Sequence, residues 1–238
     1  MELFMSTRDI LENKIENIKN CDSWNAYDEC IDELKNSVKK EDAVWLLTTD
    51  AGCTIFSTVK LGRNLFSGSI KRDLTHIFCS KYSELGSLIL KNSNDPEIRM
   101  QVIRQALYSS ISDIDEIAIR GTSEERAFVA DICSFAMLNL LKADSNFHVR
   151  KAAMKRLGPV ECLDDMLSDK MSQIRMLGAR AAPHGYKGLE AAIQKELAKG
   201  VFSIMVRKVS PDILPLILAN RNIKSKWISE IVEERMSQ

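Results

Sequence analysis

Residues 144–183 contain one pattern twice, and this repetition restricts the possible folds more than any other feature of the chain. An aspartate (Asp144, Asp169) precedes a branched apolar residue and an arginine (Arg150, Arg175), and the two arginines lie 25 residues apart. A short apolar segment follows each arginine, and a proline then breaks it. Spacing of this kind is typical of stacked helical units, each of which buries its apolar face only against its neighbours.

Apolar residues recur at steps of three and four along most of the chain, which is the period of amphipathic helices. The spacing predicts a helix over 24–38 and a long helix over 72–91, with Gly86 inside it. Thr122 and Glu125 have the spacing of a capping box, so we expect a long helix over 123–142. Because this last segment is apolar around most of its circumference, we expect it to be buried at the centre of the molecule.

Residues 41–70 are compatible with a small hairpin or with short helices. Short helices are favoured because no other part of the chain alternates with a period of two. Further on, Asp95 and Pro96 have the pattern of a helix cap followed by a first helical residue, and Ile98 and Arg99 form a weaker copy of the repeated pair. The chain is therefore predicted to be all-α, with a helical N-terminal region (1–92) packed on helical repeats (93–238).

A third, less regular unit is expected around Val206 and Arg207, which repeat the apolar–arginine pair without an upstream aspartate. A small residue stands three positions after each of the three arginines: Ala153, Gly178 and Ser210. Small residues at one recurring position would let neighbouring helices approach closely.

The sequence of aspartate, four residues, valine or isoleucine, and arginine, followed by a helix with small residues, resembles HEAT-type repeats. The short period and the proline are also similar to leucine-rich-variant repeats. The resemblance covers roughly residues 94–238 and is strongest over 144–220. It implies a right-handed α–α superhelix, here a short HEAT-like solenoid. Such proteins act mostly as curved interaction surfaces, and some HEAT-like members bind DNA, including a class of alkylated-base glycosylases.

The repeated residues Asp144, Arg150, Asp169 and Arg175 have two interpretations. In a structural ladder, each aspartate caps a helix and each arginine bonds an aspartate of the same or the next unit. In a binding site, the arginines contact a ligand. Repetition favours the ladder, because a binding site needs its residues once whereas a repeat needs them in every unit.

The C-terminal part of the chain is basic, since residues 144–238 contain 16 Lys and Arg against 11 Asp and Glu. If the units stack in register, Lys151 and Lys208 occupy equivalent positions, with Met176 between them. A basic stripe can bind phosphates or an acidic protein surface, although a solvated helix face has the same composition. The candidate contacts are Arg150, Lys151, Lys155, Arg156, Arg180, Lys187, Arg207 and Lys208.

Signals for catalysis, metals and cofactors are weak throughout the sequence. His76 and Cys79 could share a helix face, but two ligands do not make a zinc site, and no phosphate-binding loop or nucleophile motif is present. No metal or cofactor is therefore expected. Six cysteines without a C-x-x-C pair, no signal sequence and no apolar run of membrane-spanning length together indicate a reducing, cytoplasmic setting without membrane contact.

These features predict a non-catalytic interaction scaffold that binds a protein partner through the solenoid surface. The alternative is a nucleic-acid-binding protein that uses the basic face of residues 144–238, with base-excision activity of the glycosylase kind as one form. That activity would need a carboxylate and exposed aromatics beside the basic residues, whereas Trp227 lies at helical spacing with Ile223 and Ile231 and is expected in the core. The oligomeric state is left open.

Overall fold

The computed structural model describes residues 7–21, 23–57, 70–105, 111–220 and 225–238, and every regular element in these ranges is a helix. The prediction of an all-α chain is confirmed. Contacts along the chain define two units, Met1–Cys133 and Ser134–Gln238, and each is described by itself. The boundary expected after residue 92 falls inside the first of them.

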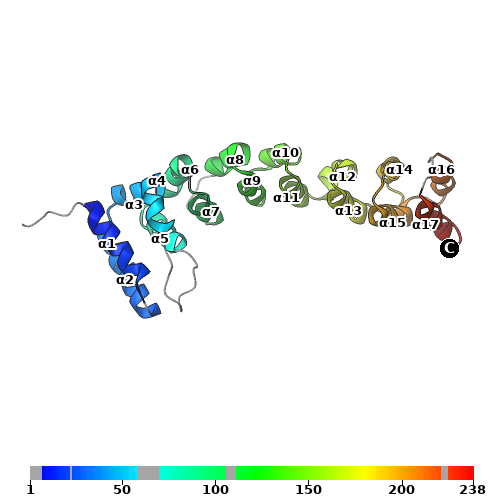
Figure 1. The fold of residues 1–238 in the computed structure, drawn as a ribbon. Helices are drawn as coiled ribbons and strands as arrows, with labels where there is room; N and C mark the ends of the chain where they lie inside the picture. The colour runs from blue at the N-terminus through cyan, green and yellow to red at the C-terminus, as the bar shows by residue number, and fades with distance from the viewer. Residues whose placement is uncertain (1–6, 22, 58–69, 106–110, 221–224) are drawn as a thin grey trace, which may run out of the picture. The chain divides into compact units, whose positions relative to one another are not determined.

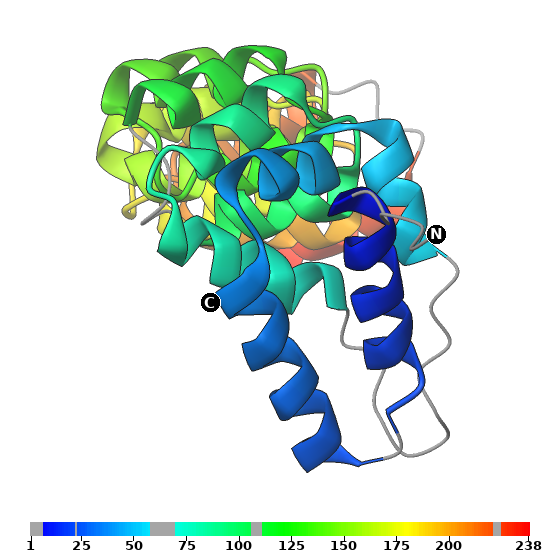
Figure 2. The ribbon, with the colours of Figure 1, turned by 90° about the vertical axis from the view of Figure 1, so that its left-hand side faces the viewer.

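The first unit contains nine helices in its described part. They are α1 (Thr7–Lys19), α2 (Trp24–Ser37), α3 (Lys40–Thr48), α4 (Asp50–Ser57), α5 (Ile70–Lys81), α6 (Leu85–Asn92), α7 (Pro96–Arg104), α8 (Ile111–Arg120) and α9 (Ser123–Val129). Helices α1 and α2 pack side by side as a hairpin, in blue in Figure 2. The short helices expected in 41–70 are present as α3 and α4, and the remainder of that segment, 58–69, lies outside the described residues.

The single helix expected over 72–91 is wrong, because the chain turns between α5 and α6. Lys81 and Tyr82 at the break donate from Nζ and Oη to the carbonyl oxygen of Val38 at the end of α2, over 3.1 and 2.8 Å. Leu85 then starts α6 as a fully buried residue.

The long buried helix expected over 123–142 is also wrong. The capping box of Thr122 and Glu125 is present, but α9 ends at Val129, and a new helix begins after Ser134, whose hydroxyl accepts from the N–H of Met137. The nearly all-round apolar pattern comes from two short helices with separate buried faces. Phe135, the first residue of the second of these helices, is 65% exposed.

The second unit contains eight helices in its described part. They are α10 (Phe135–Leu141), α11 (Phe147–Leu157), α12 (Pro159–Ser168), α13 (Ser172–Ala181), α14 (Lys187–Ile193), α15 (Lys199–Lys208), α16 (Ile213–Asn220) and α17 (Lys226–Met236). Consecutive helices pair as α10 with α11, α12 with α13, α14 with α15 and α16 with α17. Within this unit the even-numbered helices form one row and the odd-numbered helices form another, the even row and the odd row (Figure 1).

A close approach between the rows depends on Gly178 in α13. A Cβ atom at this position would lie 2.8 Å from the Cβ of Met166 and 3.1 Å from the backbone nitrogen of Leu167, both in α12. The buried core next to it contains Ala179, Leu189, Phe202, Val206 and Val232, drawn from both rows. Among the small residues noted in the sequence, Gly178 therefore has a clear packing reason.

The register expected for the third unit is wrong. Arg150 is the fourth residue of α11 and Arg175 the fourth of α13, whereas the fourth residue of α15 is Phe202. The equivalent pair is thus Val201–Phe202. Phe202 is fully buried, and its ring meets that of Trp227 edge-on at 5.3 Å, so aromatic packing replaces the arginine at this point.

Candidate functional site

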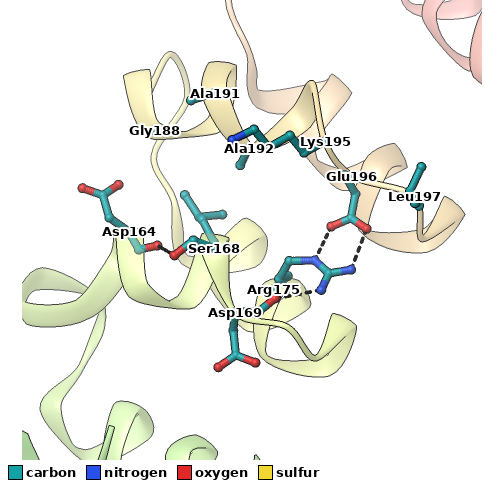
Figure 3. A pocket seen from close by; sticks show the side chains of 11 residues that line it. Asp164, Ser168, Asp169, Arg175, Gly188, Ala191, Ala192, Lys195, Glu196 and Leu197 are labelled. Carbon is teal, nitrogen blue, oxygen red and sulfur yellow. Dashed lines mark hydrogen bonds and ion pairs between the residues drawn. The ribbon is translucent and has the colours of Figure 1, made fainter. Parts of the chain in front are cut away.

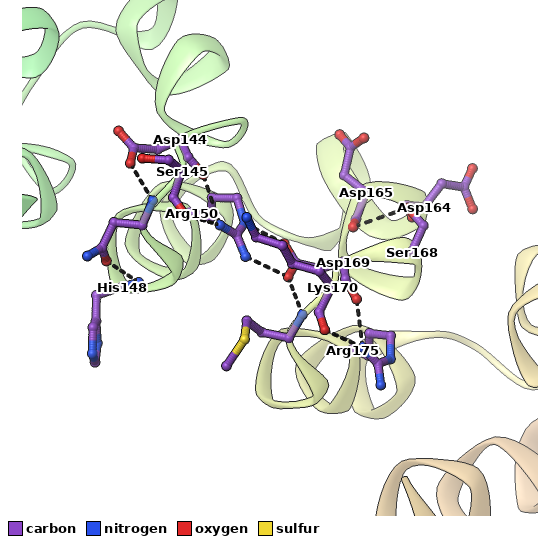
Figure 4. Close-up of polar contacts among 12 residues, drawn as sticks. Asp144, Ser145, His148, Arg150, Asp164, Asp165, Ser168, Asp169, Lys170 and Arg175 are labelled. Atoms are coloured by element: carbon purple, nitrogen blue, oxygen red, sulfur yellow. Dashed lines mark hydrogen bonds and ion pairs between the residues drawn. The ribbon is translucent and has the colours of Figure 1, made fainter. Parts of the chain in front are cut away.

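Arg150 occupies the centre of a polar network between α11 and the loop that leads into α13 (Figure 4). Its Nε and Nη2 donate to the two carboxylate oxygens of Asp169 over 2.7 and 2.9 Å. Its Nη1 donates to the carbonyl oxygens of Asp144 and Ser145 over 2.9 and 3.0 Å. Arg150 is only 4% exposed, so its guanidinium is committed to holding these two loops.

Arg175, on the next helix of the odd row, repeats the same arrangement (Figure 3). Its Nε and Nη2 donate to the carboxylate of Glu196 over 2.6 and 2.9 Å, and its Nη1 donates to the carbonyl oxygens of Asp169 and Lys170. Glu196 was missed in the sequence, although it stands six residues before Phe202, as Asp144 and Asp169 stand six before their arginines. Val206–Arg207, the pair that the sequence predicts for the third repeat, therefore lies too late in the helix, since Arg207 is the ninth residue of α15.

The side chains of three acidic residues in these loops each accept a hydrogen bond from the backbone. The carboxylates of Asp144, Asp169 and Glu196 accept from the backbone N–H two residues later over 2.7 Å in each case. The aspartates are therefore not N-caps as expected, because the N-cap residues are Asn146 for α11 and Met171 for α13. Each carboxylate instead bonds the backbone N–H of the N-cap residue, two positions later, and so holds the loop that leads into the helix.

The charged states of these acids follow from their surroundings. Burial by itself raises the pKa of Asp169, but the hydrogen bonds from Arg150 and from the N–H of Met171 outweigh it, so its pKa lies below the usual value. The pKa of Glu196 is lowered in the same way, with Arg175 in place of Arg150. Both acids are therefore ionised at neutral pH and paired with a cation.

A weaker copy of the network lies in the first unit. The Nε of Arg99, the fourth residue of α7, donates to Glu125 over 2.7 Å, and its Nη1 donates to the carbonyl oxygens of Leu90 and Ser93. The hydroxyl of Ser93 accepts from the N–H of Asp95. Serine thus takes the place of the acid six residues before the arginine.

Four of the eight basic candidates do not belong to one free face. Arg150 is buried in the network described above. The Nζ of Lys208 donates to the carbonyl oxygens of Arg180 and Ala182 over 2.5 and 2.6 Å and so closes the end of α13. The guanidinium of Arg156 lies 5.5 Å from the centre of the Phe135 ring, and Lys187 begins α14 in the even row.

The other four candidates lie in the odd row. Lys155, Arg180 and Arg207 are the ninth residues of α11, α13 and α15, and all three are exposed. Lys151 lies one turn before Lys155 on the same face of α11. We call these four residues the cationic row. In the described part of the chain, none of the four side chains makes an ion pair.

The cationic row ends at α17, whose ninth residue is Glu234. Glu230, one turn earlier, pairs at 3.5 Å with Lys226. Trp227 is packed on Phe202 as part of the core cluster, as the sequence predicted. Trp227 therefore does not form an exposed aromatic platform beside the row.

A cavity of about 600 Å³ lies beside the Arg175–Glu196 pair (Figure 3). Asp164 and Lys195 lie at its rim, and Leu197 beside it is 81% exposed. The carboxylate of Asp164 accepts from the hydroxyl of Tyr186 over 3.0 Å. The buried charges of this cavity are therefore already paired within the protein, and they suggest no chemistry.

In the described residues, no group of three or more His, Cys, Asp or Glu side chains is placed to hold a metal ion. His76 contacts Gln105 through Nδ1 at 3.2 Å, and the ring of His148 lies 3.8 Å from that of Phe147. In the same ranges no helix has the length and apolar character needed to cross a membrane.

Comparison of the chain with protein-family models, with curated proteins and with solved structures finds no match.

Proposed function

We propose that this protein is a non-catalytic cytoplasmic scaffold whose C-terminal helices form a short, right-handed, HEAT-like solenoid that binds a protein partner along the cationic row. The observation that carries the proposal is the recurrence of an exposed cation at the ninth position of α11, α13 and α15. Arg150 and Arg175, the fourth residues of α11 and α13, already bond within the fold, whereas these exposed cations make no ion pair in the described part of the chain and can contact a partner. A rigid surface of this kind lowers the ordering cost of association.

A nucleic acid is the second candidate, because the same cations suit phosphates. Affinity for a nucleic acid grows with the number of phosphates neutralised, and four cations would neutralise about four. Glu230 and Glu234 at the end of the row would repel a longer strand. Base excision would in addition need an exposed aromatic beside the row, a role that fits Trp227 poorly because it packs on Phe202. An acidic protein segment is the better match.

Charge reversal of the row tests the proposal. The full chain and its Lys155→Glu, Arg180→Glu, Arg207→Glu variant are used as baits in nuclease-treated extract of the native host, and bound proteins are quantified by mass spectrometry. A matched control reverses three exposed cations outside the row: Lys170→Glu, Lys187→Glu and Lys195→Glu. We expect a partner that the wild type and the control retain and that the row variant loses.

A titration of labelled duplex and single-stranded DNA and RNA at low and moderate salt runs in parallel. Binding to oligonucleotides that weakens steeply with salt, together with no protein lost from the row variant, would replace the protein partner by a nucleic acid. If neither class of molecule distinguishes the row variant from the control, the proposal fails.

A further inference from the structure

A second cavity lies directly on the cationic row, between α13 and α15. Its volume is about 290 Å³, and its lining includes Lys151, Met176, Leu177, Arg180, Ala198 and Gly200. We call it the Gly200 pocket. Two members of the cationic row, Lys151 and Arg180, thus stand at a hollow whose other walls are largely apolar.

Gly200 lines this hollow and adds no side chain to it. Gly200 is the second residue of α15, and the second residues of α11 and α13 are His148 and Gln173, both exposed. A glycine in a helix costs roughly 0.5–1 kcal/mol relative to alanine. At this position the glycine makes room, since even a Cβ atom would come within 3.3 Å of the Met176 methyl group.

The chemistry of the pocket separates its candidate occupants. Met176, Leu177 and Ala198 give the pocket an apolar lining. A phosphate group would lose its hydration on contact with this lining, which is unfavourable. The two cations at the rim would instead favour carboxylates on either side of an apolar side chain. Flexible Met side chains adapt to apolar groups of different shape, which suits this use.

We propose that the Gly200 pocket takes one apolar side chain from an extended, acidic segment of a protein partner, and that Lys151 and Arg180 pair with carboxylates flanking this side chain. This inference rests on the proposed function and names the chemistry of the partner. Helices α13 and α15 pack on each other, and packed helices lie about 8–10 Å apart, a distance that an extended chain covers with about three residues.

Peptide selection followed by direct binding tests this inference. A library of random peptides of about ten residues is displayed and selected on the full chain, and one enriched peptide is synthesised with a fluorescent label. Versions with the apolar residue replaced by Ser, or with the acidic residues replaced by Gln, are compared by fluorescence anisotropy. We expect selected peptides with one Leu, Ile, Met or Phe between acidic residues, and about tenfold weaker binding for either replacement.

A matched pair of variants locates the contact. Gly200→Gln gives α15 the side chain that α13 has at the same position, so it fills the pocket while leaving the fold intact, and it should weaken binding about tenfold or more. Ser203→Gln adds similar bulk one turn later on α15, outside this pocket, and should bind as the wild type. Thermal unfolding of both variants checks that the fold is unchanged.

Two results would overturn the inference, and they bear differently on the proposed function. If acidic peptides bind equally to the wild type and to Gly200→Gln but not to the charge-reversed variant, the role of the pocket is refuted. The proposed binding of a protein partner along the cationic row then still stands. A selection that enriches no peptide, combined with salt-dependent binding to oligonucleotides, would remove both.

Discussion

Replacing Asp169 with Asn tests whether the buried arginine network stabilises the second unit. The substitution keeps the size of the side chain and an oxygen that can accept from the N–H of Met171. It removes the carboxylate that receives Arg150 over 2.7 and 2.9 Å. The guanidinium, 4% exposed, would then be a buried cation whose remaining partners are carbonyl oxygens.

Removing one member of a buried ion pair typically costs about 3–5 kcal/mol. We expect the lower end, about 3 kcal/mol, because the bonds from Arg150 to two carbonyl oxygens remain. The control is Asp165→Asn, which breaks a pair with Lys142 at the same 2.7 Å, but with side chains 27% and 48% exposed. Exposed pairs contribute about 0–1 kcal/mol, so burial is the variable that differs between the two substitutions.

The assay is urea unfolding of the full chain, followed by tryptophan fluorescence in a Trp24→Phe, Trp45→Phe background, where Trp227 reports on the second unit. A loss of about 3 kcal/mol lowers the midpoint by roughly 1.5 M for a slope of about 2 kcal/mol/M. Adding Arg150→Met to Asp169→Asn should restore part of the loss, because the unpaired buried charge is gone. Equal destabilisation by Asp169→Asn and Asp165→Asn would refute the reasoning.

Three further predictions concern stability and reactivity. Gly178→Ala should destabilise the second unit by about 1–3 kcal/mol, because its Cβ would lie 2.8 Å from a methionine of α12. Gly200→Ala should instead be neutral or slightly stabilising. Thermal unfolding of the two variants measures the difference. The folded-state pKa values of Asp169 and Glu196 lie below their unfolded values, so the stability they contribute is complete above about pH 5 and falls as the pH drops through the folded values. Unfolding midpoints across pH should show this acid-side loss, and it should be smaller in the variant carrying Asp169→Asn and Glu196→Gln. Burial raises the pKa of Cys79 to about 12, so mass spectrometry should find it alkylated by iodoacetamide only when the first unit unfolds.

The helical class could be read from the sequence because periodicity and capping are local. The Asp95–Pro96 start of α7 and the Thr122–Glu125 capping box both appear as expected. The ends of helices could not be read in the same way. Phe135 continues the apolar pattern of α9, and yet it belongs to the next helix, which Ser134 caps. The position of this break depends on which face each of the two short helices buries, and the apolar pattern alone does not show that.

The third repeat was misread because its two signals changed together. Glu196 replaces the aspartate and Phe202 replaces the arginine, so neither letter of the pattern remains. What survives is the spacing of six residues and the geometry, since Glu196 still accepts from the N–H of Ala198 and still receives a guanidinium, that of Arg175.

The two uses of arginine in the second unit follow from position in the helix alone. The fourth residue of an odd-row helix faces the preceding loop and the next unit, so a cation there must be paired, as Arg150 and Arg175 are. The ninth residue is exposed, so Lys155, Arg180 and Arg207 present their charge to the solvent. A net charge calculated over residues 144–238 cannot distinguish these two sets, because it counts Arg150 and Arg180 equally. The positions predict that neutralising a fourth-position arginine mainly lowers stability, whereas reversing a ninth-position cation mainly lowers partner binding, and a single pair of variants, Arg175→Met and Arg180→Glu, separates the two effects.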